Sequence, residues 1–219
     1  MPAGTKRLSS ICARAGGGSI NVLDQLVGGL FDHDLTVATR VGRKDNLKPL
    51  EAKTWGSRAF TGKLVVLIDS TTRGANEFLA RVVQLEHRGV VIGDRSSGRS
   101  VESKCHSLSL GGGALAAMPF ISTQRNAARP GMGAIISSYT VSVTDADLVM
   151  SDGKSLEHVG VIPDQIILPT AADLAAGRDP MLAKAAELAG YDKLDAVAAA
   201  NVFPRIWAPE TTVASVLLE

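Results

Sequence analysis

A strand–helix–strand pattern lies at the centre of the chain, between residues 63 and 99. Residues 64–68 form a continuous apolar run, which is typical of a parallel strand buried on both faces. Apolar residues then recur at the spacing of one helix face, and a second apolar run follows at residues 90–92. This order predicts a right-handed βαβ unit. We expect chemistry in the loop at residues 69–77, because a helix N-terminus offers free backbone N–H groups.

Periodic patterns on either side predict the other elements and an α/β fold class. They are a helix at 19–32, strands at 35–41, 101–110 and 138–144, a surface loop or hairpin at 43–60, a short apolar run at 166–168, and helices at 170–176, 180–189 and 192–200. We therefore expect a disordered or poorly packed segment at 1–15, an α/β core at 16–169, and C-terminal helices with a tail at 170–219. The glycine- and alanine-rich residues 111–134 are either a mobile insertion or a flap over a site.

Composition excludes several classes of partner. Of the 219 residues, 45% are hydrophobic and 21% charged, and the net charge of +1 gives no electrostatic footprint for nucleic acid or an anionic membrane. No stretch has the apolar length of a transmembrane helix or a signal peptide. Cys12 and Cys105 are expected to be unpaired thiols. The sequence predicts no cofactor, and it leaves cellular location and homo-oligomerisation open.

Two groups of residues have both a chemical and a structural interpretation. The glycines at 16–18 precede a helix, so they form either an anion cradle or a flexible entry turn. The acidic residues Asp145, Asp147 and Asp152 lie close together and resemble an oxygen-rich cation loop, but their spacing misses the calcium-loop pattern. Turns with Asp at their caps are the preferred interpretation of these residues, so the sequence predicts no metal site and leaves the three aspartates as weak candidates.

Four sequence blocks together resemble the catalytic core of the tail-specific, or C-terminal-processing, serine peptidases. They are GGGS at 16–19, KLVVLID at 63–69 followed by Ala-Asn-Glu at 75–77, VVIGDRSSGR at 90–99, and SDGKSLEHVGVIPD at 151–164. Each block is weak alone, but the four in this order are fairly specific. The resemblance covers residues 16–168.

The resemblance implies a spiral α/β core like that of the ClpP and crotonase folds. It also implies hydrolysis of a peptide or a small acyl substrate by a Ser–Lys pair, with an oxyanion hole formed by the backbone amides of Gly17 and Ala75. The PDZ domain that commonly precedes this core is not in the sequence. Relatives of this kind are often exported.

Two positions depart from the family's pattern. Gly74 stands where the family has its nucleophilic serine, and Arg99 stands where it has the lysine base. Glycine has no side chain that could attack a carbonyl, and arginine stays protonated and cannot accept a proton. Glu77 matches the family's glutamate, either as a catalytic group or as a carboxylate that favours the helix dipole. His106 is the histidine best placed to act in a site, although a surface or core role is its default interpretation.

These observations leave several functions open. One is a hydrolase that cleaves an ester or lactone with activated water, which Asp145, Asp147 or Asp152 would supply directly or through a cation. Another is an inactive pseudo-peptidase that binds a peptide or acts as a scaffold. A third is that the chain is a truncated or engineered piece in which Gly74 replaces a serine.

Overall fold

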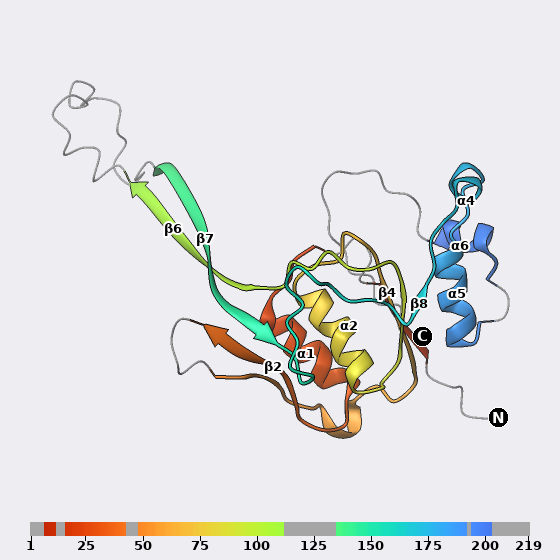
Figure 1. Ribbon diagram of the computed structural model, residues 1–219, viewed down its shortest axis with the longest axis horizontal. Helices are drawn as coiled ribbons and strands as arrows, with labels where there is room; N and C mark the ends of the chain where they lie inside the picture. Colours follow the sequence, from red (N-terminus) through yellow and green to blue (C-terminus); the bar gives the residue numbers. More distant parts are fainter. Residues whose placement is uncertain (1–6, 12–15, 43–47, 112–134, 192–193, 203–219) are drawn as a thin grey trace, which may run out of the picture. The chain divides into compact units, whose positions relative to one another are not determined.

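The computed structural model describes residues 7–11, 16–42, 48–111, 135–191 and 194–202 (Figure 1). The chain divides into two compact units. The larger unit comprises residues 1–101 and 147–219, and the smaller unit comprises residues 102–146. Each unit is described separately below.

A four-stranded parallel sheet lies at the centre of the larger unit. Its order is β1 (Arg7–Ile11), β4 (Lys63–Ile68), β5 (Val90–Gly93) and β8 (Gln165–Ile166). Helix α2 (Ala75–Leu85) connects β4 to β5, and these two strands pair in parallel. The predicted βαβ unit is therefore confirmed.

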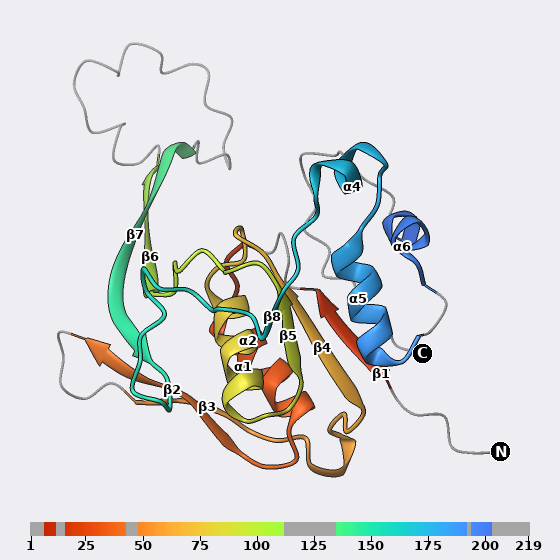
Figure 2. The same ribbon diagram turned by 45° about the vertical axis from the view of Figure 1, so that its right-hand side comes forward.

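Strand β4 is buried on both faces, as its apolar run predicts. Alternate residues point to opposite sides of a strand, so β4 contributes to two separate cores. One core contains Leu64, Val66 and Ile68 with residues of α1 (Ile20–Leu30) and α2. The other contains Val65 and Leu67 with Ile92, Ala185 and Ala189, of which the two alanines belong to α5 (Pro180–Ala189). Figure 2 shows α1 and α2 on one side of the sheet and α5 on the other.

Part of the N-terminal segment at 1–15, which was expected to be disordered or poorly packed, forms a strand. Residues 7–11 form β1, which pairs in parallel with β4 from Arg7↔Lys63 to Ile11↔Leu67. Parallel pairing depends on backbone N–H and C=O groups, which a sequence pattern of side chains does not reveal. An unpaired β4 would leave those backbone groups without partners, and β1 supplies them on one edge.

A second sheet has the order β3 (Leu50–Ala52), β2 (Leu35–Gly42), β7 (Ile135–Val149) and β6 (Glu102–Gly111). Strand β3 lies within residues 43–60 and pairs antiparallel with β2, which agrees with the hairpin alternative for that segment. Strands β6 and β7 form a long antiparallel ribbon in the smaller unit (Figure 1). The expected insertion or flap at 111–134 lies almost entirely outside the described residues.

Three helices follow the parallel sheet, as the sequence predicts. They are α4 (Ala171–Ala175), α5 and α6 (Ala196–Val202). The side chain of Thr170 caps α4 by accepting a hydrogen bond from the Asp173 amide, and Asp179 caps α5 through the Leu182 amide. In the described part of the chain, no helix combines the length and the apolar character needed to cross a bilayer. Cys105 is an exposed free thiol, and Cys12 lies outside the described residues.

Candidate functional site

The turn from β4 into α2 has the shape of a nucleophile elbow. The Asp69 carboxylate accepts hydrogen bonds from the backbone amides of Thr71 and Thr72 at 2.9 and 3.0 Å, which fixes the start of the loop. Gly74 then caps α2 with φ of +66° and ψ of −130°. A sharp, strained strand-to-helix turn of this kind exposes the side chain of a nucleophilic serine in other hydrolases. Here the strained position is a glycine, which adopts positive φ without steric cost.

The glycine run at 16–18 lies directly beside this elbow. A Cβ atom built on Gly74 would lie 3.3 Å from the Cα of Gly17. The Asn76 side-chain amide donates a hydrogen bond of 3.0 Å to the Gly17 carbonyl. A side chain at position 74 would therefore point at the backbone of the glycine run.

Close packing continues along the glycine run. A Cβ atom on Gly18 would lie 2.6 Å from the Cβ of Ala75, so a larger residue at position 18 would force the two segments apart. Gly16 forms an isolated parallel bridge with Arg73, the residue before the elbow. The structure thus brings Gly17, Gly74 and Ala75 together, as the predicted anion cradle requires.

Glu77 is a buried hub between the elbow and the turn that follows β5. Its side chain is fully buried, at 0% exposure. One carboxylate oxygen accepts hydrogen bonds from the amides of Gly74 and Arg99 at 3.0 and 3.1 Å. The other accepts hydrogen bonds from the Gly98 amide at 2.7 Å and the Ser96 hydroxyl at 2.6 Å. The carboxylate therefore holds the backbone at positions 74 and 99, the two positions at which the sequence predicts a departure from the Ser–Lys pattern.

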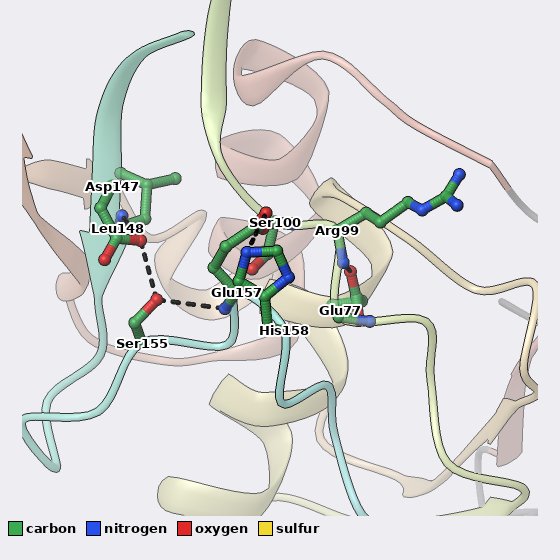
Figure 3. A network of polar contacts seen from close by, with 9 residues as sticks. Glu77, Arg99, Ser100, Asp147, Leu148, Ser155, Glu157 and His158 are labelled. Atoms are coloured by element: carbon green, nitrogen blue, oxygen red, sulfur yellow. Dashed lines mark hydrogen bonds and ion pairs between the residues drawn. The ribbon is translucent and has the colours of Figure 1, made fainter.

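Positions 74 and 99 are adjacent, but neither carries the chemistry of a Ser–Lys pair. The Gly74 amide donates a hydrogen bond of 3.0 Å to the Arg99 carbonyl. The Arg99 side chain is exposed, and Figure 3 shows it extending away from Glu77. Because a guanidinium remains protonated in proteins, this side chain cannot act as a general base.

A second polar network adjoins the turn that carries Arg99 (Figure 3). The Glu157 carboxylate accepts a hydrogen bond of 2.7 Å from the Ser100 amide. The Glu157 amide donates to the Ser155 hydroxyl at 3.1 Å, and this hydroxyl donates to the Asp147 carboxylate at 2.8 Å. The sequence predicted no role for Glu157. Its position in the sequence block at 151–164 was the one available signal, and spacing could not show that it reaches Ser100.

His158 lies next to the same turn. Its amide donates a hydrogen bond of 2.8 Å to the Gly98 carbonyl, and its φ of +60° is unusual for a residue with a side chain. The imidazole is 91% exposed, and its Nε2 atom lies 3.8 Å from a carboxylate oxygen of Glu157. His106, the histidine that the sequence favoured, lies instead on β6 in the smaller unit, with an exposed side chain.

The three candidate cation ligands do not converge. Asp145 pairs with Lys104, Asp147 accepts the Ser155 hydroxyl, and Asp152 accepts a hydrogen bond of 2.6 Å from Arg81. Burial opposes ionisation of Asp152, but hydrogen bonds from Arg81 and the Lys154 amide outweigh it and hold the pKa of Asp152 below its ordinary value. Among the residues that the structure describes, no group of three His, Cys, Asp or Glu side chains could hold a metal ion.

Comparisons with known proteins bear on the family and the fold of the chain. The model of peptidase family S41 matches residues 13–167. Among solved structures, a candidate peptidase from Parabacteroides merdae ATCC 43184 has a TM-score of 0.57 and 18% identity, with 83% of this chain and 50% of that chain covered. The photosystem II D1 C-terminal processing protease has a TM-score of 0.52 and 20% identity, with 73% of this chain and 34% of that chain covered.

Mature CPAF also has a TM-score of 0.52, with 14% identity and with 72% of this chain and 38% of that chain covered. This chain thus spans between about a third and a half of the length of these structures. No protein with curated annotation matches it. The resemblance inferred from the four sequence blocks is confirmed, and the chain belongs to peptidase family S41, with the α/β fold of these peptidases.

Proposed function

We propose that this S41 family member binds a peptide at the elbow and does not cleave it by Ser–Lys chemistry. The observation that supports the proposal is the contrast around Glu77. The carboxylate holds the backbone of positions 74 and 99, yet position 74 has no side chain and position 99 has a guanidinium. Loss of an activated nucleophile or its base typically lowers catalysis by several orders of magnitude.

The peptide carbonyl would bind between the glycine run and the N-terminus of α2. The first N–H groups of a helix have no acceptor within the helix, so the Ala75 amide can be offered to a ligand. The 3.3 Å distance from a Cβ atom built on Gly74 to the Gly17 Cα supports the Gly17 amide as the second donor of this site. The spiral arrangement of the ClpP and crotonase folds remains our prediction for the core that supports this site.

Hydrolysis of an ester or lactone by activated water is the competing function. It requires a carboxylate or a cation that is free to activate water near the elbow. Asp145, Asp147 and Asp152 are each engaged with another side chain, so they give this alternative little support.

Peptide binding and turnover can be measured on the same samples of the full chain. The probes are fluorescein-labelled dodecapeptides of mixed sequence for fluorescence polarisation, the same peptides in a cleavage assay, and p-nitrophenyl acetate as an ester. We expect saturable peptide binding with no cleavage and no ester turnover above the buffer rate. Peptide cleavage, or the absence of binding to every peptide, would overturn the proposal. Ester turnover without peptide binding would favour the competing function.

Restoring the two missing groups tests whether the elbow is intact. The double variant Gly74→Ser, Arg99→Lys should react with a fluorophosphonate probe, because the new hydroxyl would point at the glycine run and a lysine at position 99, unlike arginine, can lose its proton and turn back towards the elbow. A serine at φ of +66° costs on the order of 1–3 kcal/mol of strain, which the surrounding contacts must offset. The matched control is Gly74→Ala, Arg99→Lys, which carries the same strain without a hydroxyl. Equal labelling of the two variants would contradict the proposed geometry.

A further inference from the structure

Ser96 occupies the junction of three segments that surround the elbow. It belongs to the turn after β5, and it is buried, at 5% exposure. Its hydroxyl donates to Glu77 of α2 at 2.6 Å and accepts a hydrogen bond of 2.7 Å from the amide of Val161, which belongs to the closing segment at residues 156–161. Its own amide donates to the Val161 carbonyl at 3.0 Å. One side chain thus links the elbow helix, the turn that carries Arg99 and the closing segment.

The direction of the hydroxyl proton is determined by its neighbours. A backbone N–H can only donate, so the Ser96 oxygen must be the acceptor towards Val161. Its single proton is then available for the Glu77 carboxylate, which also receives the amides of Gly74, Gly98 and Arg99. This arrangement fixes the rotation of the carboxylate, because each oxygen atom has two donors directed at it.

Two glycines allow the closing segment to approach Ser96 closely. A Cβ atom on Gly160 would lie 2.5 Å from the Ser96 carbonyl oxygen and 3.0 Å from its hydroxyl oxygen. A Cβ atom on Gly98 would lie 2.9 Å from the Gly160 amide nitrogen. Both glycines also have positive φ, at +70° and +66°. Side chains at these positions would separate Ser96 from Val161 and weaken the link to the elbow.

We propose that Ser96 is a positioning residue of the elbow. It orients the Glu77 carboxylate, and through it the backbone of Gly74 and Arg99, so that the elbow keeps its ligand-binding shape only while the closing segment is docked. The effect on ligand affinity rests on the proposed peptide-binding function, whereas the effect on backbone order does not. The two parts can therefore be tested separately.

Two neighbouring serines provide a matched pair of variants. Ser96→Ala removes a hydroxyl with two hydrogen bonds, whereas Ser97→Ala removes a buried hydroxyl that has no hydrogen-bond partner. Ser96→Thr keeps the hydroxyl and serves as the conservative replacement. Hydrogen–deuterium exchange of the backbone amides, detected by NMR on the full chain, measures local order. Fluorescence polarisation with the labelled dodecapeptides measures binding.

We expect Ser96→Ala to accelerate exchange at least tenfold at Gly74, Gly98 and Arg99, while Val66 and Ile92 in the sheet exchange as in the unmodified chain. Peptide affinity should fall by about tenfold, and Ser97→Ala and Ser96→Thr should leave both readouts nearly unchanged. Equal acceleration in the sheet, or no change at the elbow amides, would overturn the proposal. If no sample binds peptide but the elbow amides respond as expected, peptide binding fails and the positioning role of Ser96 stands.

Discussion

The elbow in the larger unit and the β6–β7 ribbon in the smaller unit are organised in opposite ways. At the elbow, the side chains of Glu77 and Thr72 are both fully buried, and hydrogen bonds from the elbow loop and from the turn after β5 converge on the Glu77 carboxylate. In the ribbon, Tyr139, Val141 and Val143 are 58%, 59% and 50% exposed. One buried carboxylate, that of Glu77, holds the elbow backbone, whereas the antiparallel pairing of β6 with β7 holds the ribbon.

The ribbon shows why a regular strand pattern does not by itself indicate a core. His106 pairs with Val141 and Lys104 pairs with Val143, so polar and apolar side chains share one face. Isolated two-stranded hairpins are marginally stable in water. Burial and convergent hydrogen bonds therefore hold the backbone near the site, and a periodic strand pattern alone does not indicate that a segment is held in this way.

The largest effect is expected for Glu77→Ala. Three backbone amides and the Ser96 hydroxyl would lose their acceptor, and each unsatisfied buried group costs about 1–3 kcal/mol. We expect the free energy of unfolding to fall by roughly 3–5 kcal/mol, as measured by urea denaturation. Glu86→Ala is the control, because Glu86 is exposed at the end of the same helix. A similarly small decrease in the free energy of unfolding for both variants would show that the elbow is no more constrained than the surface.

Leu67→Ala tests the sheet from which the elbow emerges. Leu67 is 2% exposed and packs in the core that α5 covers. Leu→Ala in a core removes buried apolar surface and leaves a cavity, so the free energy of unfolding should fall by about 3 kcal/mol. Leu26→Ala on α1 is the matched control, since Leu26 is 43% exposed. An equal decrease in the free energy of unfolding for Leu67→Ala and Leu26→Ala would contradict the assignment of a second core to β4.

The sequence predicted the elements whose side-chain pattern reports burial. The apolar run at 64–68 predicted strand β4 to within one residue of its ends, and the apolar face that follows predicted a helix where α2 lies. Gly74 and Arg99 were selected because each stands at a fixed place in a sequence block, and the structure brings them together through one hydrogen bond. Their assignment to a ligand site stays a prediction.

What the sequence missed depends on three-dimensional contacts between distant segments. Strand β1 is formed by backbone pairing, and the roles of Ser96 and Glu157 follow from hydrogen bonds to residues 19 and 57 positions away. A serine or glutamate gives no periodic signal of such contacts. His106 was favoured because it follows Arg99 in sequence, but β6 places it in the other unit.

Val141→Ser should have a much smaller effect than the core variants. Val141 lies on the exposed side of β7, so the substitution removes little buried surface, and the free energy of unfolding should change by less than about 0.5 kcal/mol. Val66→Ser is the matched control, because Val66 is 0% exposed and a buried hydroxyl without a partner is costly. A loss at Val141 as large as that at Val66 would mean that the ribbon face is covered in solution.

Asp24→Asn tests one of the exceptions to the paired polar groups of the larger unit, which also include the buried hydroxyls of Ser97 and Ser100. One oxygen atom of Asp24, on α1, is buried without a hydrogen-bond partner. Burial raises the pKa of Asp24 above its ordinary value, and the nearby charge of Arg40 only partly offsets this. The folded chain therefore binds the proton more tightly than the unfolded chain, and stability falls as the pH rises from the unfolded pKa through the folded pKa.

The asparagine has no charge to bury, so Asp24→Asn should be more stable than the unmodified chain at pH 7, and this advantage should disappear below the unfolded pKa of about 3.9. Asp34→Asn provides a control of opposite sign. A hydrogen bond from the Thr54 amide, followed by one from Lys53, lowers the pKa of Asp34, so its charged form favours folding above that pH. Urea denaturation at pH 7 and pH 3 measures both variants. If Asp24→Asn were the less stable chain at pH 7, the Asp24 carboxylate would have a partner in solution, and the larger unit would have one fewer exception to its paired polar groups.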